Sequence, residues 1–286
     1  MKRRDFLKLA GVGVAYASGC ARSTAIVPPE RDFWFAHLSD THIGFKGAPS
    51  PEAELLLPRA VDAINAAATR PAFVVFTGDL THTVDDPQER RRRMAHFREE
   101  VSRLRVPSLR FLPGEHDATL DEGEAFREAF GPSRWSFDHE GVHFIGLDNV
   151  SLGAALGKEQ LEWLEADLAR VPREAPTVVF AHRPLFDLYP AWDWDTTDGA
   201  RAIELLARRE NVSVFYGHIH QEHTHETGSI VHHAARSLVF PLPPPGGAPQ
   251  RVPLPYDAAA TDHGVGWREA KMRYSLAAPI SRTLVT

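Results

Sequence analysis

The sequence holds a single cysteine, Cys20, among its 286 residues. No disulfide can therefore form within one chain, so the fold depends on its hydrophobic core and on any metal ions that it binds. Metal sites built from thiolates are excluded for the same reason. With 43% hydrophobic residues the chain can bury a full core, and one large domain is the default expectation.

The sequence also lacks an excess of positive charge. It carries 32 Lys and Arg against 38 Asp and Glu, a formal net charge of -6, and the two signs are interspersed except at residues 90–93. Those arginines fall in a predicted amphipathic helix over residues 87–104, where we interpret them as a solvated helix face. Without a basic surface, nucleic acid is not expected as a partner.

The amino terminus lacks an apolar run long enough to span a bilayer, because residues 9–17 are few and rich in Gly and Ala. The preceding Lys2 to Lys8 segment resembles a bacterial twin-arginine export signal. Cys20 stands where a lipoprotein would be processed; the alternative is a chance cysteine in a discarded peptide. Residues 1–27 are therefore predicted to be a signal peptide and linker. The expected partner is the export machinery, and the expected location is periplasmic or membrane-anchored as a lipoprotein.

Strand and helix signals alternate through residues 28–240, which predicts one α/β domain. Helices are expected over residues 51–69, 87–104, 122–130, 158–170 and 197–209. Two strand signals, 135–137 and 142–147, are separated by only four residues and predict an antiparallel hairpin, so the sheets should be mixed. A Pro- and Gly-rich stretch begins at Pro241. Residues 241–286 are predicted to be an extension packed on the same domain, either draped over the core or added at an edge.

Five short apolar runs each end in residues that can bind a metal. The runs and their following residues are 33–38 with Asp40 and His42, 73–76 with Asp79, 108–112 with Glu115, His116 and Asp117, 177–180 with His182, and 212–216 with His218 and His220. One Gly-Asp turn alone would be weak, because it is also ordinary turn chemistry. Since open α/β sheets bind ligands at the carboxyl ends of their strands, the series predicts one site that collects residues from five strand ends.

The order of these blocks resembles the calcineurin-like metallophosphoesterases, from Phe33 to about His233. The resemblance implies an α/β fold of four layers, an α/β/β/α sandwich with two mixed sheets, and a dinuclear site at the strand ends. It implies that Asp40, His42 and His220 hold the first metal, that His182 and His218 hold the second, and that Asp79 bridges both. Imidazole and carboxylate donors suit two divalent or mixed-valence ions of Mn, Fe or Zn.

The third strand end carries the implied catalytic residues and one departure from the family. His116 resembles the family's histidine near the leaving group, with Asp117 expected to orient its ring. Glu115 stands where Asn usually binds the second metal, and its carboxylate could still reach that ion. Two divalent cations with Asp40, Asp79 and one hydroxide leave a charge of +1, which an ionised Glu115 lowers to zero. This favours a diester over a dianionic monoester, or a trivalent cation such as Fe³⁺.

Other residues leave two interpretations open. His37 is interpreted as a packing residue of its strand and His82 as a surface-loop histidine, although it follows Asp79 closely. Exposed positions are expected for most of a later group of histidines, namely His223, His225, His232 and His233. Arg183 could contact a substrate phosphate or pair with a nearby carboxylate. The aromatic segment 185–195 could wall the substrate pocket or pack against the extension.

Two functions follow from these residues. The leading hypothesis is a metal-dependent phosphoric ester hydrolase, phosphodiesterase or phosphatase, that cleaves a small phosphoester by in-line attack of hydroxide held by the metals, with diesters favoured. The alternative is a non-catalytic protein of the same fold that binds metal or a phosphate ligand, in which Glu115 has replaced a residue needed for turnover.

Overall fold

The structure, a computed structural model, describes residues 32–256, 264–273 and 276–283. The expected export signal and Cys20 lie outside the described residues. Within them, no helix is both long enough and apolar enough to cross a bilayer.

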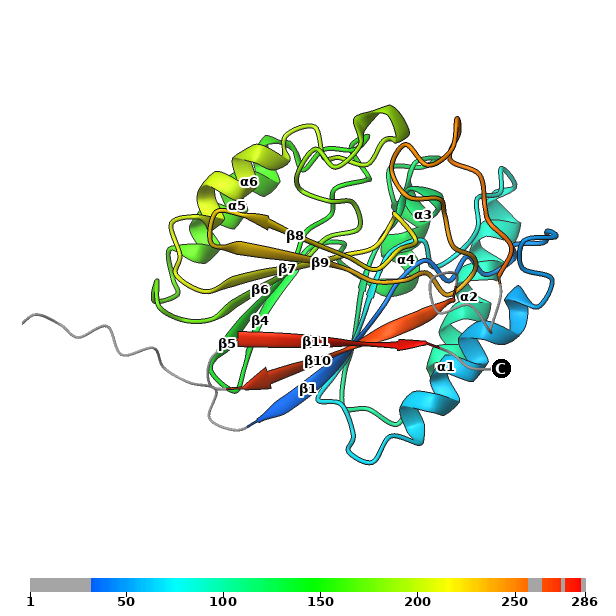
Figure 1. Cartoon of the computed structure of the whole chain (residues 1–286), viewed down its shortest axis with the longest axis horizontal. Helices are drawn as coiled ribbons and strands as arrows, with labels where there is room; N and C mark the ends of the chain where they lie inside the picture. The colour runs from blue at the N-terminus through cyan, green and yellow to red at the C-terminus, as the bar shows by residue number, and fades with distance from the viewer. Residues whose placement is uncertain (1–31, 257–263, 274–275, 284–286) are drawn as a thin grey trace, which may run out of the picture.

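Two mixed β-sheets lie face to face between two groups of helices (Figure 1). The first sheet has the order β11-β10-β1-β2-β3 and the second has the order β4-β5-β6-β7-β9-β8. The strands of the first are β1 (Phe33–Leu38), β2 (Val74–Thr77), β3 (Leu109–Leu112), β10 (Gly266–Arg273) and β11 (Leu276–Thr283). Those of the second are β4 (Trp135–His139), β5 (Val142–Gly146), β6 (Thr177–Phe180), β7 (Val212–Tyr216), β8 (His223–Thr227) and β9 (Ile230–Ala234).

The described helices, except the short one at Glu115–Ala118, cover the outer face of a sheet. The helices are α1 (Ala53–Asn65), α2 (Pro87–Val101), α3 (Glu115–Ala118), α4 (Glu124–Phe130), α5 (Gly157–Leu168) and α6 (Gly199–Leu206), with a 3-10 turn at Pro190–Trp192. Helices α1, α2 and α4 share one apolar cluster with β1 and β2, and α5 and α6 share another with β5, β6 and β7. A third cluster, rich in Phe, fills the space between the sheets. Three cores between four layers confirm the predicted α/β/β/α sandwich.

Strand β1 shows how the sequence sorts side chains between these cores. Trp34, Ala36 and Leu38 pack with the helices, whereas Phe35 joins the core between the sheets. This period of two places apolar residues on both faces of the strand, as a strand covered on both sides requires. The strand pairs in parallel with β2, and β2 pairs in parallel with β3, so all three carboxyl ends reach one edge.

The predicted helices are present with shifted ends. The last was expected over 197–209, but α6 begins at Gly199 and ends at Leu206. Asp198 precedes it and accepts hydrogen bonds from the backbone N–H groups of Leu156 and Gly157, at the start of α5. A capping carboxylate therefore serves a different helix from the one that follows it in the sequence, which spacing alone does not reveal.

The C-terminal extension adds strands at a sheet edge. Strand β10 pairs antiparallel with β1 on one side and with β11 on the other. Trp267 of β10 is buried and its ring lies 6.1 Å from that of Trp34. An edge position was one of the two alternatives that the sequence left open, because the extension has few periodic cues.

Candidate metal centre

The carboxyl ends of β1, β2, β6 and β7 and the start of α3 converge on one buried group of side chains. Five of these residues have left-handed backbone conformations, with φ of 56° at Asp40, 42° at His42, 49° at Asp79, 64° at His218 and 54° at His220. Such a conformation is unfavourable for a residue with a side chain and persists only where the surroundings impose it. Here the backbone N–H groups of Asp40 and His42 donate to the carbonyls of Gly78 and Asp79, at 3.0 and 2.9 Å.

Two glycines make room for this approach. Gly78 has φ of 98°, and a Cβ placed on it would lie 2.5 Å from Nδ1 of His182. A Cβ on Gly114 would lie 2.0 Å from Oδ1 of Asp79. The turns after β2 and β3 therefore require glycine because side chains of the site occupy the adjoining space.

A first group of donor atoms consists of Asp40, His42 and His220. Nε2 of His220 lies 3.3 Å from Oδ1 of Asp40 and 3.3 Å from Nε2 of His42. All three side chains are buried. Two donors bound to one ion at about 2.0 to 2.1 Å with a tetrahedral angle lie about 3.3 Å apart, so this spacing fits a shared metal ion.

A second group consists of Glu115, His182 and His218. Oε2 of Glu115 lies 2.7 Å from Nε2 of His182, and Oε1 lies 2.8 Å from Nδ1 of His218. Burial opposes ionisation of Glu115, but the facing His218 and His182 outweigh it and hold the pKa of the carboxyl well below its usual value. The residue that departs from the family pattern thus lies among the expected ligands of the second metal.

Asp79 lies between the two groups. Its Oδ2 is 3.5 Å from Nε2 of His42 in the first group and 3.6 Å from Nε2 of His182 in the second. Its Oδ1 accepts a hydrogen bond from the backbone N–H of His116 at 2.9 Å. One carboxylate therefore faces both groups, as a bridging ligand would.

The second nitrogen of three of the histidines binds a backbone carbonyl. Nδ1 of His182 contacts the carbonyl of Thr77 at 2.6 Å, and Nδ1 of His220 contacts that of Phe240 at 2.7 Å. Nε2 of His218 contacts that of Asp193 at 3.0 Å. A carbonyl can only accept, so in the neutral ring that a metal requires, the proton lies on the contacting nitrogen and the nitrogen that faces the site keeps a free lone pair.

Several site atoms are buried without a hydrogen bond to any described residue. They are Oδ1 of Asp40, Oε2 of Glu115, Nε2 of His182 and Nδ1 of His218. Some approach each other closely, yet without the angle that a hydrogen bond requires. Buried acceptor atoms need a partner, and a cation bound between them would provide one. These carboxylate and imidazole residues therefore fit the implied metals.

His116 lies beside this group. Its Nε2 is 3.9 Å from Oδ2 of Asp79, and its Nδ1 accepts a hydrogen bond from the backbone N–H of Thr83 at 3.2 Å. The hydroxyl of Thr83 contacts the same nitrogen at 2.6 Å. Because Nδ1 accepts, the proton of the neutral ring lies on Nε2, which points toward the site as a donor.

The expected role of Asp117 was wrong, because Thr83 and not Asp117 contacts the ring of His116. The Asp117 carboxylate instead accepts hydrogen bonds from the backbone N–H groups of Gly114, Leu80 and Thr81 at 2.9 to 3.0 Å. Burial, with the nearby Asp79, raises its pKa to about 6. Asp117 therefore connects, through these hydrogen bonds, the loop that follows Asp79 with the loop that precedes His116.

His82 lies in a loop, as interpreted, but it is half-buried and contacts the site. Its Nδ1 lies 3.2 Å from Nδ1 of His42, and its ring stacks on that of His116 at 5.0 Å. Burial, with His116 and Arg93 nearby, lowers its pKa to about 4, so the ring is neutral at pH 7. The only sequence signal was its position three residues after Asp79.

Arg183 is buried and engaged by the protein itself. Its Nε donates to the carbonyl of Asp195 at 2.8 Å, Nη2 lies 3.6 Å from the carboxylate of that residue, and Nη2 also donates to the carbonyl of Asp193. This is the carboxylate pairing that the sequence had left open as the alternative to a phosphate contact. The carbonyl of Asp193 also accepts a hydrogen bond from the ring of His218. Arg183 therefore holds the loop that orients this candidate ligand.

The aromatic segment packs against the C-terminal extension. Trp192 and Trp194 are buried in one cluster with Phe240 and Leu242. Arg251 of the extension donates to the carbonyl of Trp192 at 3.0 Å, and the same Nη1 lies 3.4 Å from Nε2 of His218. No sequence signal indicated that this arginine reaches the site, because it lies far outside the five strand ends.

The later histidines are more buried than expected. His232 and His233 are buried, and His223 and His225 are half-buried. They lie on β8 and β9, where the central position of β9 between β7 and β8 covers its side chains. His37 packs as expected, with Nε2 at 2.8 Å from the hydroxyl of Thr77. None of these five belongs to the two donor groups.

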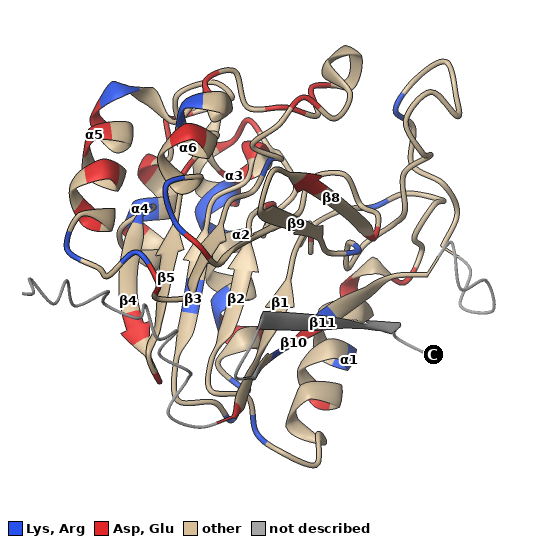
Figure 2. Ribbon diagram, turned by 60° about the vertical axis from the view of Figure 1, so that its left-hand side comes forward, with Lys and Arg blue, Asp and Glu red and all other residues tan. Residues whose placement is uncertain are grey.

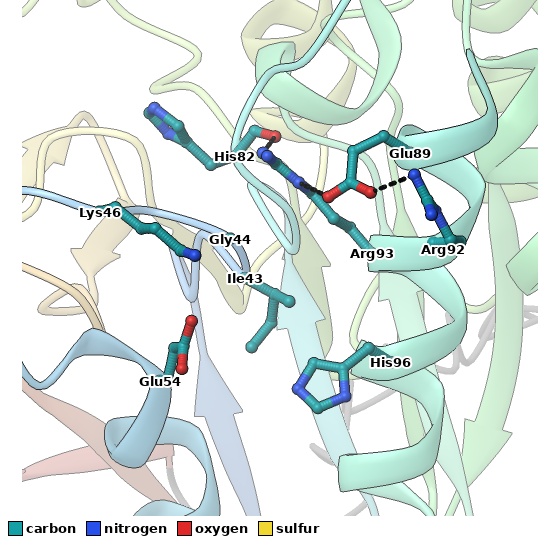
Figure 3. Close-up of a pocket in the computed structure, with 9 residues that line it drawn as sticks. All are labelled: Ile43, Gly44, Lys46, Glu54, His82, Glu89, Arg92, Arg93 and His96. Carbon is teal, nitrogen blue, oxygen red and sulfur yellow. Dashed lines mark hydrogen bonds and ion pairs between the residues drawn. The ribbon is translucent and has the colours of Figure 1, made fainter. Parts of the chain in front are cut away.

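A surface hollow of about 560 Å³ lies behind His82 (Figure 3). Ile43, Gly44, Lys46, Glu54, Glu89, Arg92, Arg93 and His96 line it together with His82. Arg93 donates to the carbonyl of His82 at 2.8 Å and to Glu89 at 3.0 Å. Lys, Arg and Glu side chains all line it, so the charges around it are mixed. Mixed charge is general on this protein, as Figure 2 shows for α5. Arg93, which lines the hollow, therefore helps to fix the backbone of His82.

Comparison with known proteins was consistent with this geometry. The sequence model of the calcineurin-like phosphoesterase family matches residues 33–222. A probable cyclic nucleotide phosphodiesterase of Rhodopseudomonas palustris is 28% identical over 219 residues, which cover 71% of this chain and 77% of that protein. A 3',5'-cyclic adenosine monophosphate phosphodiesterase of Escherichia coli is 30% identical over 156 residues, 52% of this chain and 54% of that protein.

Solved structures show the same fold. A dimetal phosphatase of Danio rerio superposes with a TM-score of 0.63 at 14% identity, over 88% of this chain and 98% of that one. The arrangement of two sheets between two groups of helices is therefore shared with that phosphatase.

Proposed function

Because the chain belongs to the calcineurin-like phosphoesterase family and is a metal-dependent phosphoric ester hydrolase, we propose that it uses two metal ions and prefers phosphodiesters. Asp40, His42 and His220 would hold one ion and Glu115, His182 and His218 the other, with Asp79 between them. The relatives named as phosphodiesterases support the choice of ester.

One observation carries the proposal of two ions. The structure contains two separate groups of three donors, and a single carboxylate oxygen of Asp79 lies within 3.6 Å of a ligand nitrogen in each. A single ion would leave one group of buried donor atoms without partners, which is unfavourable.

The protein's own residues divide the work around the scissile phosphorus. When bound, two ions of this kind polarise phosphoryl oxygens and lower the pKa of an attacking water. His116 presents Nε2–H, which donates to a phosphoryl oxygen or to the departing oxygen as the ester breaks. Thr83 fixes the tautomer that makes this possible, and the carbonyls of Thr77, Phe240 and Asp193 fix the orientation of the ligand rings.

The preference for diesters rests on Glu115. Two divalent cations bring four positive charges, and Asp40, Asp79 and Glu115 bring three negative ones, whereas Asn in place of Glu115 would leave only two. Opposite charges about 4 Å apart interact by about 4 kcal/mol at an effective dielectric constant near 20, so one unit changes the binding of an anion. A dianionic monoester loses more from the extra carboxylate than a monoanionic diester does.

Glu115→Asn and Glu115→Gln are therefore expected to raise kcat/KM for p-nitrophenyl phosphate relative to bis(p-nitrophenyl) phosphate. Gln keeps the length of the side chain and removes only its charge, so it separates the effect of charge from the effect of side-chain length. Both variants should also bind inorganic phosphate more tightly, as measured by its inhibition constant. An unchanged ratio with two divalent ions still bound would show that Glu115 is not a charged ligand of the site.

The direct test of the function uses the purified protein with Mn²⁺, Zn²⁺ or Fe²⁺ added after treatment with a chelator. We expect hydrolysis of the diester to return with the metal and to exceed hydrolysis of the monoester. Hydrolysis that is independent of metal would contradict the proposal, and a monoester rate above the diester rate would contradict the preference.

We further propose export through the twin-arginine pathway, which rests on residues 1–27 of the sequence alone. Replacing Arg3 and Arg4 by Lys is expected to leave the protein in the cytoplasm, because that pathway requires the arginine pair. Fractionation with an antibody to the mature chain measures the result, and unaffected export would exclude this route. Mass spectrometry of the exported protein would show whether Cys20 carries lipid.

A further inference from the structure

His42 differs from the other candidate ligands in what holds its second nitrogen. In His182, His218 and His220 that nitrogen contacts a backbone carbonyl. In His42 it is Nδ1, and it lies 3.2 Å from Nδ1 of His82. An imidazole thus stands where the other three ligands have a carbonyl oxygen.

The direction of this hydrogen bond follows from the metal site. Nε2 of His42 faces Asp79 and His220, so the ring proton lies on Nδ1 when Nε2 binds an ion. Nδ1 of His82 must then accept, which requires that the proton of its own neutral ring lie on Nε2. Unlike a carbonyl, this acceptor belongs to a side chain and can be removed by substitution.

Contacts of both its backbone and its ring hold His82 in this position. Its backbone N–H donates to the carbonyl of Ile43 at 3.0 Å, and its carbonyl accepts from Arg93 at 2.8 Å (Figure 3). Its ring stacks on His116 and meets the ring of Phe45 edge-on at 5.3 Å. A side chain fixed at both backbone and ring gives its partner a fixed orientation.

We propose that His82 is the positioning residue of the first metal: it accepts the Nδ1 proton of His42 and thereby directs Nε2 toward the ion. This inference rests on the proposed function, because it assumes that His42 binds a metal. Loss of such a partner typically lowers metal affinity about 10- to 100-fold. Only one of the two ions should be affected, because His182 and His218 have their own carbonyl partners.

A competing explanation is that His82 is itself a ligand. His42, His82 and His116 bring three nitrogen atoms within 4.8 Å of one another, close enough for a further ion. In His116, however, Nδ1 is occupied by Thr83, and Nε2 lies 3.9 Å from Asp79 and so faces the main site. The contacts therefore favour the positioning role, and the two explanations predict different numbers of ions.

The test compares His82→Ala, His82→Asn and the control His96→Ala in the full chain. Asn places Oδ1 near the position of Nδ1 of histidine, so it restores an acceptor without a ring. The control removes another imidazole of the same hollow that is exposed and contacts no candidate ligand. The number of Zn²⁺ ions per chain and their dissociation constants are measured by competition with a chromogenic chelator. The melting temperature in EDTA checks that each variant folds.

The expected result is two ions in every variant, with one of them bound about 10- to 100-fold more weakly in His82→Ala and restored in His82→Asn. Equal affinities in His82→Ala and the unchanged protein would overturn the inference and leave the proposed function intact. Three ions that fall to two in His82→Ala, without rescue by Asn, would overturn it in favour of a ligand. Fewer than two tight ions in the unchanged protein would overturn the proposed function together with this inference.

Discussion

Asp79→Asn is expected to abolish hydrolysis and to remove more metal than the loss of any ligand that serves one ion. Its Oδ2 lies 3.5 Å from a nitrogen of the first donor group and 3.6 Å from a nitrogen of the second, so this one carboxylate oxygen faces both groups. The neutral amide removes one negative charge from between two cations and offers only one oxygen. Losing several kcal/mol of stabilisation at the transition state lowers the rate about 10³-fold or more.

Metal content by plasma mass spectrometry and turnover of bis(p-nitrophenyl) phosphate measure this effect. Asp85→Asn is the matched control, because this exposed carboxylate lies six residues further along the same loop. It should keep both metals and normal turnover. Near-normal metal content with retained turnover in Asp79→Asn would mean that the carboxylate does not bridge.

His116→Ala should leave both metals bound and lower kcat about 10²- to 10⁴-fold, the usual contribution of a positioned proton donor. The ring lies beside the two donor groups and belongs to neither of the expected ligand sets, so its loss removes a donor and no proposed ligand. If Nε2–H protonates the departing oxygen, the loss should shrink for esters with good leaving groups. An equal loss for nitrophenyl and alkyl esters would place the hydrogen bond on a phosphoryl oxygen instead.

Thr83→Val provides the companion experiment. Valine keeps the shape of the side chain and removes the hydroxyl that contacts Nδ1 of His116 at 2.6 Å, while the backbone N–H remains. We expect a smaller fall in kcat than in His116→Ala and an unchanged metal content. A kcat in His116→Ala equal to that of the unchanged protein would exclude the ring from the reaction.

The predicted site residues could be gathered from the sequence because their positions follow from strands. Buried strands such as 73–76 are recognisable as apolar runs, and parallel strands bring their carboxyl ends to one edge. Residues directly after such runs must then lie close together, as Asp40, Asp79 and His182 do. The alternation of strands and helices predicted an α/β core with mixed sheets, and the four layers were predicted from the family resemblance alone.

The partners of those residues could not be predicted because most of them are backbone groups. The carbonyl that accepts a hydrogen bond from His220 belongs to Phe240. The groups that donate to the Asp117 carboxylate include backbone N–H groups of two different loops. Backbone groups look alike in every residue, so a sequence does not show which will be used. This is why Asp117 was assigned to His116, whereas the contacts of the His82 ring are with side chains from other loops, which the sequence does not place beside it.

The place of β10 at the sheet edge was one of two alternatives that the sequence left open, for another reason. Its charged residues suggest an exposed segment, yet Arg268 and Glu269 are buried in the sheet. Arg268 donates to the carbonyl of Ala234 and lies 3.4 Å from Glu222, so its charge is compensated by contacts with the second sheet. Compensation of this kind depends on residues far away in the sequence, which a local pattern cannot include.

The central claim is that this chain binds two metal ions bridged by Asp79, with Glu115 as a ligand of the second. A crystal structure of the protein loaded with Zn²⁺, with anomalous data at the zinc edge, tests it most directly. The account predicts two anomalous peaks, one among Asp40, His42 and His220 and one among Glu115, His182 and His218, both in contact with Asp79. A single peak, or two peaks with Glu115 turned away from both, would contradict it.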